Sequence, residues 1–418
     1  MTSNSKRSSL RPFRLFLVIL LLLVTVLPML QVQILGLASI NRNGGVIATN
    51  LDSLPLIDLE PPSKPSTFTP DSPRFLLGIM SHDQYIQEKE RRATIRSTYL
   101  SFFSKYEGGT PNRICALLDL VLEATRGNDN LLWNQCQLAY TFVVGGATTV
   151  DNNTSWNHTE LLEPKVSSEL LTRTPHAESD VISLNIQENG KFGKSPTWFR
   201  YVSLLLNELN EEHDQHQDGN NNNNNNNYTN NKFLQFDYVI KSDSDTLIIP
   251  KRFFRWVEEQ EQEKILTKLA SVADSGTNSR LERHAIYGGS AFDKEMCGFP
   301  SHEHCALLQT PVYMGGALYF VSTDLADYIS SSQCPRTKLF IPHEDMTMGN
   351  YVHSYENYTL QHDTTPRKVV HMSHPEAYLS TWIHPVKNPK RMKGMWRKYI
   401  QQHQKRQQKH QRPKEGPP

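Results

Sequence analysis

Two aspartates separated by one residue, Asp243 and Asp245, follow a short apolar run that ends at Ile240. Carboxylates at positions i and i+2 where a buried strand stops can point into the crevice at the strand's carboxyl end, where open α/β sheets bind ligands. Mg²⁺ and Mn²⁺ take oxygen ligands of this kind together with substrate phosphates. The turn therefore indicates a divalent metal that binds a diphosphate, although an acidic turn that caps the following helix has the same pattern.

Two other phosphate or metal motifs share part of this pattern. A calcium loop of the EF-hand type needs an oxygen ligand at its fifth position, and Leu247 stands there, so this class is excluded. The Asp-x-Asp-x-Thr pattern of haloacid-dehalogenase-type phosphatases is approached, but Thr246 follows the second aspartate directly, one position early. A phosphotransferase therefore remains an alternative, ranked third after the two functions given at the end of this section.

Histidine and arginine side chains could complete such a site. A metal held by two carboxylates has room for one imidazole, and His371, at the end of a predicted strand, is the first candidate, with His374 as the alternative. Arg92 and Arg96 lie four residues apart, so they share one face of a predicted helix. There they could approach a nucleotide or pair with acidic side chains.

Small and aromatic residues supply further candidates for ligand contact. Gly315 and Gly316 would let the backbone approach a ligand closely, and a strand bulge would use the same residues. Trp382 and Trp396 could stack on a sugar face, whereas ordinary packing is the simpler interpretation.

Charge is distributed unevenly along the 418 residues. The chain has 44 Lys and Arg against 43 Asp and Glu, and the net charge of +1 argues against a uniformly basic nucleic-acid-binding protein. Residues 1–14 carry four basic residues and no acid, and residues 385–418 carry eleven basic residues and one acid. The remaining residues, 15–384, therefore hold a net charge of −13.

Residues 15–30 contain no charged side chain, and the uncharged stretch continues to Ile40. Since a membrane-spanning helix needs about 20 apolar residues, we predict a signal-anchor at 15–37. The basic residues precede it, so the positive-inside rule places residues 1–14 in the cytoplasm and the rest of the chain in the lumen of the secretory pathway. A signal peptide cleaved near Ala38 is the alternative.

Glycosylation sequons and cysteines are compatible with a lumenal location. Sequons begin at Asn152, Asn153, Asn157, Asn227 and Asn357. Because thiols oxidise in that compartment, we predict two disulfides between cysteines that are close in sequence, which leaves Cys334 over. The predicted pairs are Cys115 with Cys136 and Cys297 with Cys305.

The composition divides the chain into an anchor, a stem, a body and a tail. Residues 38–73 are rich in proline and predict an extended stem. Residues 74–400 alternate strand-like apolar runs with helix-like segments, which predicts a single α/β domain. Two long insertions are expected at 107–137 and at 211–231, the second with eight consecutive asparagines, and residues 401–418 are expected to form a disordered basic tail.

Four segments occur in the same order as the motifs of a known family. They are Arg92-Ala-Thr-Ile-Arg-Ser-Thr-Tyr99; Glu178-Ser-Asp180-Val-Ile182 with Lys194 and Trp198; Lys241-Ser-Asp-Ser-Asp-Thr246; and Tyr313-Met-Gly-Gly-Ala-Leu-Tyr-Phe-Val-Ser322 followed by Glu344-Asp345-Met-Thr-Met-Gly349. The chain thereby resembles glycosyltransferase family 31, the group of β-1,3-galactosyltransferases, β-1,3-N-acetylglucosaminyltransferases and Fringe. It departs from the family's K-x-D-D-D pattern at Ser244, and Tyr99 stands in a tryptophan position.

The resemblance implies a GT-A-like, Rossmann-like mixed sheet flanked by helices, in one lumenal catalytic domain behind the membrane helix. It implies a UDP-sugar donor and Mn²⁺ or another divalent cation on Asp243 and Asp245, with His371 as the third expected ligand. It makes Asp345 the base that takes the acceptor's proton, with Glu344 beside it as a second catalytic carboxylate.

The function expected from this resemblance is that of a Golgi type II membrane enzyme. It would transfer galactose or N-acetylglucosamine from a UDP-sugar, with inversion, to a hydroxyl of a glycan or glycoprotein acceptor in β-1,3 linkage. Its partners would be the donor, the acceptor and the membrane, with no nucleic acid. The alternative is a catalytically inactive membrane-tethered protein of the same fold that binds a sugar or UDP.

Overall fold

The computed structural model describes eleven segments of the chain. They are residues 72–101, 113–125, 136–147, 178–187, 193–218, 235–270, 283–292, 312–339, 344–363, 367–373 and 381–411. All of them belong to one compact unit, Pro61–Pro418. Within these segments no helix has the length and hydropathy needed to cross a membrane. The predicted anchor at 15–37, nearly all of the stem, four of the five sequons and the Cys297–Cys305 pair lie outside the described residues.

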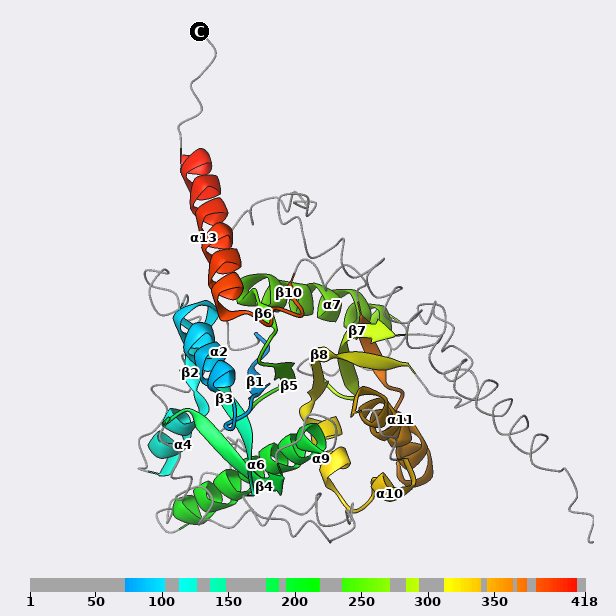
Figure 1. The fold of residues 1–418 in the computed structure, drawn as a ribbon. Helices are drawn as coiled ribbons and strands as arrows, with labels where there is room; N and C mark the ends of the chain where they lie inside the picture. The colour runs from blue at the N-terminus through cyan, green and yellow to red at the C-terminus, as the bar shows by residue number, and fades with distance from the viewer. Residues whose placement is uncertain are drawn as a thin grey trace, which may run out of the picture. The chain divides into compact units, whose positions relative to one another are not determined.

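A mixed β-sheet forms the centre of the described body (Figure 1). Its strands are β1 (Phe75–Met80), β2 (Arg113–Ala116), β3 (Cys136–Ala147), β4 (Val181–Gln187), β5 (Tyr238–Asp243), β7 (Ile286–Phe292), β8 (Tyr313–Ser322) and β9 (Val370–Ser373). Their order is β2-β3-β1-β5-β8-β7-β9, and β4 also pairs with β3. β8 runs antiparallel to β5 and β7, whereas the remaining pairs are parallel.

Helices surround this sheet (Figure 1). They are α2 (Ile86–Ser97), α4 (Leu117–Thr125), α6 (Lys194–Asp218), α7 (Pro250–Ala270), α9 (Thr323–Ser330), α10 (Arg336–Leu339), α11 (Glu344–His362) and α13 (Pro389–Gln411). A short ribbon of β6 (Leu247–Ile248) and β10 (Trp382–Ile383) stands apart from the main sheet. The α/β class predicted from alternating strands and helices is confirmed.

The two longest central helices cover opposite faces of the sheet. Phe75 of β1 contacts Phe253 of α7 through ring centroids 5.5 Å apart. Gly78, three residues along the same strand, faces the indole of Trp198 in α6, and a Cβ there would collide with that ring. Because side chains alternate along a strand, residues three apart point to opposite faces. The sheet is therefore buried on both sides, which explains why every residue of β1 is buried.

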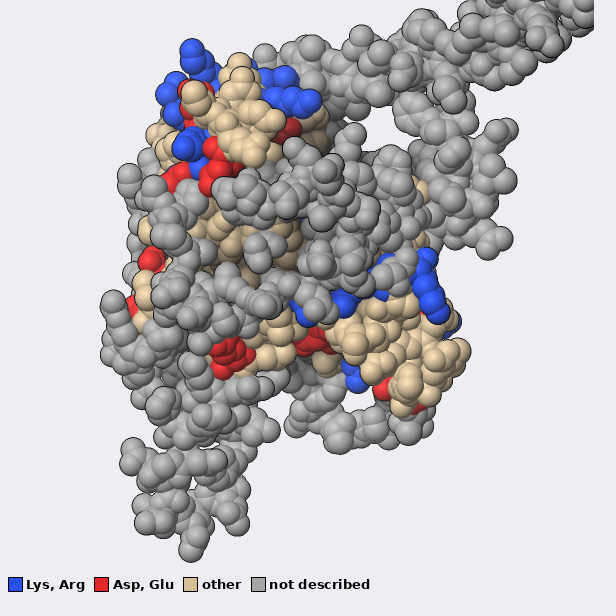
Figure 2. All heavy atoms as spheres, turned by 60° about the horizontal axis from the view of Figure 1, so that its bottom comes forward, with Lys and Arg blue, Asp and Glu red and all other residues tan. Residues whose placement is uncertain are grey.

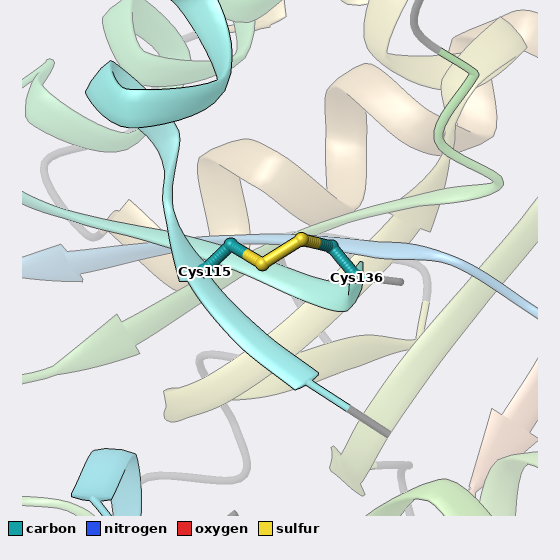
Figure 3. Close-up of a disulfide and its surroundings, with 2 residues drawn as sticks. All are labelled: Cys115 and Cys136. Atoms are coloured by element: carbon teal, nitrogen blue, oxygen red, sulfur yellow. A yellow bond between two sulfur atoms is a disulfide. The ribbon is translucent and has the colours of Figure 1, made fainter. Parts of the chain in front are cut away.

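A disulfide joins the outer strands at one edge of the sheet. Cys115 in β2 and Cys136 at the start of β3 are bonded, with Cα atoms 5.9 Å apart (Figure 3). This confirms the first of the predicted pairs, and Cys334 is a buried free thiol. The segment 107–137, expected as an insertion, thus contributes a paired edge strand and α4 to the body.

The C-terminal segment differs from its prediction. Residues 401–411 were expected to belong to a disordered tail, but α13 continues to Gln411 as one helix. The high content of Gln, Lys and Arg gave the segment its polar composition, and these straight-chain residues are also good helix formers. Similarly, α6 extends to Asp218, into the insertion expected at 211–231.

Candidate active site

The carboxyl ends of β1 and β5 bring the acidic turn to one edge of the sheet. β1 and β5 are parallel, and Met80 pairs in register with Asp243, the last residue of β5. β8 runs in the opposite direction, so its first half lies at the same edge, next to Asp243. Residues from β1, β5, β8 and the helices that follow them therefore meet at one place.

Asp243, Asp245 and His384 form the group of potential metal ligands in the described residues. One ligand atom from each lies within 4.8 Å of the others. The Asp243 side chain is 36% exposed and that of His384 25% exposed, so the group can be reached from solvent. Two carboxylates and an imidazole form a donor set that Mn²⁺ accepts, so these residues fit a divalent cation.

The ribbon of β6 and β10 positions His384 over the acidic turn. Trp382 and Ile383 of β10 pair with Ile248 and Leu247 of β6, directly after the turn. On the far side of His384, the Val386 N–H donates to the Asp245 carbonyl over 2.7 Å. His384 lies between these two attachments, and its Nδ1 is 3.1 Å from Asp245 Oδ1 and 3.2 Å from Thr246 Oγ1.

His371, the histidine expected as the third metal ligand, is not part of this group. It lies on β9, where its ring stacks on His353 with centroids 5.0 Å apart and lies 6.2 Å from Tyr287. β9 pairs with β7 at the end of the strand order, three strands away from β5, which carries Asp243. The alternative, His374, falls outside the described residues. Among the described residues, His384 and not His371 is therefore the histidine that lies beside Asp243 and Asp245.

Lys241 is a buried cation surrounded by carboxylates. Its Nζ lies 2.8 Å from Asp243 Oδ1 and 3.5 Å from Glu344 Oε1, and it donates to the Gly316 carbonyl. Burial by itself lowers the pKa of a lysine, but the negative charges of Asp243, Glu344 and Asp345 raise the pKa of Lys241 above its usual value. This lysine therefore stays protonated and holds the acidic side chains together.

Asp345 lies against the backbone of β8 at the start of α11. The Gly316 N–H donates to Asp345 Oδ2 over 2.9 Å, and a Cβ at position 316 would collide with the same carboxylate. Burial and the adjacent charge of Glu344 raise the pKa of Asp345 to about 6. A carboxylate with this pKa can accept a proton near neutral pH, which suits a general base.

Glu344 is held by hydroxyl groups from two other elements. The Tyr319 hydroxyl donates to Glu344 Oε1 over 2.9 Å, and Ser195 Oγ donates to the same oxygen. Lys241 is the cation facing this oxygen. Glu344 is therefore anchored by its neighbours.

Gly315 lies beside Gly316 in β8, where the pairing with β7 changes register. Gly289 pairs with Tyr319 and Ala291 with Met314, so the strand is irregular between these pairs. This irregularity corresponds to the bulge weighed in the sequence. It brings the Gly316 N–H to Asp345.

Ser244, which stands where the family pattern has an aspartate, binds a carboxylate from another element. Its Oγ donates to Glu88 Oε2 of α2 over 2.6 Å. Glu88 also pairs with Arg91, whose Nε and Nη2 donate to the Lys387 carbonyl over 3.1 and 2.9 Å. This network connects the acidic turn, α2 and the segment that follows His384.

Arg92 and Arg96 are engaged by acidic side chains. Arg92 is fully buried and pairs with Glu178 at 2.5 Å and with Asp83 at 3.0 Å. Arg96 binds both Glu178 and Asp180 at 2.5 Å. Burial raises the pKa of a carboxyl, but here the two arginines prevail and lower the pKa of Glu178 to about 2. Of the two roles weighed in the sequence, the structure shows the pairing with acids.

Both tryptophans considered for sugar stacking are buried in the body. Trp382 packs against Trp256 and Phe253, with ring centroids 5.7 and 6.5 Å apart. Trp396 of α13 contacts Tyr99 of the body at 6.5 Å. Their packing role is thus the one the structure shows.

His384 and Glu88 do not stand out as site residues in the sequence. The one available signal is the position of His384 directly after Trp382-Ile383, an apolar pair able to extend a short strand such as Leu247-Ile248. Glu88 is one of several acids on a polar helix, and its proximity to Ser244, 156 residues away, arises from the parallel pairing of β1 with β5.

Comparison with known proteins identifies part of the chain. Residues 226–361 match the sequence profile of the galactosyltransferase family. This range includes the acidic turn, β8 and the Glu344–Asp345 pair, so the resemblance is confirmed over that part and glycosyl transfer is supported as its chemistry. A solved structure, a glycosyltransferase involved in the glycosylation of the major capsid of PBCV-1, aligns with a TM-score of 0.23 and 11% identity, over 78% of this chain and 100% of that chain. No curated protein matches the chain significantly.

Proposed function

We propose that this chain transfers galactose or N-acetylglucosamine from a UDP-sugar to a hydroxyl of a glycan or glycoprotein acceptor, with inversion and in β-1,3 linkage. The match of residues 226–361 to the galactosyltransferase family supports this proposal. The observation that carries the proposal is that Lys241 faces both Asp345 and Asp243, and that Asp243 belongs to the group of potential metal ligands with Asp245 and His384. A potential metal site and a carboxylate of raised pKa are the two parts that this reaction needs.

Asp243, Asp245 and His384 would hold Mn²⁺ or a similar divalent cation. A bound divalent cation offsets the negative charge that develops on a departing diphosphate. Lys241 keeps Asp243 in place, since its Nζ is 2.8 Å from Oδ1. The ribbon of β6 and β10 fixes the imidazole.

Asp345 would act as the base. As the acceptor oxygen attacks the anomeric carbon, its proton passes to an Asp345 oxygen, the new carbon–oxygen bond forms, and the bond to UDP breaks on the opposite face. The Gly316 N–H holds Oδ2 at 2.9 Å and thereby orients the carboxylate. A positioned base of this kind contributes about 10²–10⁴-fold to the rate.

The proposal extends to fold family and location. We assign the mixed sheet to the GT-A type, because its metal-ligand group stands at the carboxyl end of a central parallel strand. We place the enzyme in the Golgi as a type II membrane protein anchored by residues 15–37. The Cys115–Cys136 disulfide supports an oxidising compartment.

The decisive experiment is a panel of UDP-sugars incubated with the purified protein, with Mn²⁺ or with a chelator, while UDP release is measured. We expect Mn²⁺-dependent release from one hexose donor and its loss in Asp243→Ala and Asp245→Ala, together with loss of Mn²⁺-dependent UDP binding in calorimetry. Binding of UDP and Mn²⁺ with no turnover of any donor would instead favour the inactive sugar- or UDP-binding alternative. Release of phosphate from an aryl phosphate would favour a phosphotransferase.

A further inference from the structure

The C-terminal helix α13 carries charge of one sign. Residues 385–411 contain nine Lys and Arg and no Asp or Glu. On the face of the molecule drawn in Figure 2, by comparison, basic and acidic side chains both occur in small groups. α13 is therefore a cationic element on a chain whose residues 15–384 have a net charge of −13.

One side of α13 is attached to the body and another faces solvent. Met392, Met395 and Trp396 are buried, and the α13 helix contacts α2. Lys390, Lys393, Arg397 and Lys405 are exposed. At 100° per residue these four side chains fall within about a third of the helix circumference, so they form one stripe, which we call the cationic stripe. Within the described segments, none of these four side chains forms an ion pair with an acid.

Placing these charges together does not stabilise the helix. The first turn of α13 contains basic residues and no acid, opposite to the preference of the helix dipole. Lys393 and Arg397 are like charges four residues apart, a spacing that destabilises a helix by a few tenths of a kcal/mol. The pattern is thus explained better by an external anionic partner than by helix stability.

The cationic stripe begins close to the candidate active site. Pro389, the first residue of α13, follows His384 by five residues, which span at most about 18 Å when fully extended. The two Arg91 hydrogen bonds to the Lys387 carbonyl hold this connection against α2. From Lys390 to Gln411 the helix extends about 30 Å further, and Figure 1 shows it projecting beyond α2.

We propose that the cationic stripe binds an anionic polysaccharide, a glycan chain that carries carboxylate or sulfate groups, and so holds the acceptor near the site. The inference rests on the proposed function, and it names the acceptor class. A linear polymer with regularly spaced negative charges matches a stripe about 20 Å long from Lys390 to Lys405. Such binding is electrostatic and weakens with salt.

An anionic membrane is the other partner with suitable charge, but α13 lacks the exposed apolar face that binding to a membrane requires. A helix that lies in a membrane interface needs an exposed apolar face. The apolar side chains Met392, Met395 and Trp396 are covered by the body. Beyond Ile400 the helix contains only Gln, His, Lys and Arg. The outer half of α13 therefore offers charge without a surface that could enter lipid.

The test compares binding of a chondroitin sulfate decasaccharide and an uncharged dextran of equal length to the full chain, by fluorescence anisotropy at several salt concentrations. We expect the wild type to bind only the sulfated glycan. The triple variant Lys390→Gln, Lys393→Gln, Arg397→Gln should lose at least tenfold in affinity and show a flatter salt dependence. The control variant Lys338→Gln, Arg367→Gln, Lys368→Gln removes three exposed charges elsewhere and should bind like the wild type.

Equal binding by wild type and triple variant, or equal binding of the neutral dextran, would overturn the proposal. The proposal would also be overturned if the triple variant still bound the glycan but no longer bound phosphatidylcholine vesicles containing 30% phosphatidylserine. That result would assign the stripe to a membrane. The assay contains no metal and no UDP-sugar, so its outcome is independent of transfer. If the glycan binds through the stripe but no donor is turned over, the docking surface stands and the proposed enzymatic function fails.

Discussion

Two charged clusters near the carboxyl end of β1 differ in how their charges are balanced. In the first, two guanidiniums, Arg92 and Arg96, face the carboxylates of Glu178, Asp180 and Asp83 at 2.5–3.0 Å. In the second, Lys241 is the buried cation facing Asp243, Glu344 and Asp345, while Asp245 lies next to His384. The pKa of Glu178 is lowered to about 2, whereas the pKa of Asp345 is raised to about 6.

The contrast separates a cluster whose charges are balanced from one that has an excess of negative charge. Each acid of the first cluster has an arginine within hydrogen-bond distance, and the two arginines lower the pKa of Glu178. The second has more carboxylate charge than one lysine can balance. A divalent cation at Asp243, Asp245 and His384 would supply the missing positive charge. We therefore expect opposite effects when one charged group is removed from each cluster.

The largest expected effect is that of Asp345→Asn on catalysis. The variant keeps the shape of the side chain but cannot take the acceptor's proton, so kcat should fall by about 10²–10⁴-fold while UDP and Mn²⁺ still bind. Steady-state transfer kinetics and calorimetry with UDP measure the two properties. A purified variant with wild-type kcat would show that Asp345 is not the base.

The same substitution also tests whether the carboxylates around Lys241 carry an excess of negative charge. A carboxyl whose pKa is raised on folding destabilises the folded state above its unfolded pKa, so Asp345→Asn should raise the melting temperature of the metal-free protein at pH 7–8. In the wild type, kcat/KM should fall as pH decreases through about 6, because the base becomes protonated. A lower melting temperature in the variant would contradict the imbalance.

Next in size is Arg92→Met, which breaks the balanced cluster. Removing one partner of a buried ion pair leaves Glu178 without part of its compensation, and the loss in unfolding free energy should be about 3–5 kcal/mol. Arg255→Met, which removes an exposed pair with Glu259, is the control and should cost less than about 1 kcal/mol. Urea denaturation measures both, and similar values for the two variants would refute the structural role.

The dependence of stability on pH provides a second test of the structural role of Arg92. A carboxyl with a lowered pKa contributes stability that is present above its unfolded pKa of about 4.3 and is lost as the pH falls toward 2. Arg92→Met should therefore make stability less dependent on pH in that window.

A smaller effect is expected when the imidazole of the metal group is removed. His384→Ala should weaken Mn²⁺ binding by at least about 10–100-fold. Mutation of a residue that only positions a metal ligand already reduces metal affinity by this factor. His371→Ala is the matched control, because its ring contacts His353 and Tyr287, and its Mn²⁺ affinity should stay within about twofold. Mn²⁺ titration followed by electron paramagnetic resonance gives the result without an activity assay. The reverse order of effects would restore His371 as the ligand.

The sequence predicts those features that depend on local pattern. The apolar runs of β1 and β5, the helix spacing around Trp198, the Asp-x-Asp turn and the Cys115–Cys136 pair all lie within short stretches, so composition and spacing reveal them. His384 and Glu88 cannot be found this way, because their neighbours are brought to them by a β-ribbon and by parallel strands. α13 shows a different limit, since a polar composition distinguishes poorly between a disordered tail and a solvated helix.

The smallest expected effect concerns Ser244, where the chain departs from the family's triplet. Ser244→Ala removes the 2.6 Å hydrogen bond to Glu88 and should lower the unfolding free energy by about 1–2 kcal/mol. Ser244→Asp, which restores the family residue, should cost more, because a second carboxylate would face Glu88. The double variant Ser244→Asp, Glu88→Gln should recover most of that loss, since the amide can donate to the new carboxylate. A double-mutant cycle by urea denaturation measures the coupling, and strictly additive effects would show that Ser244 and Glu88 do not depend on one another.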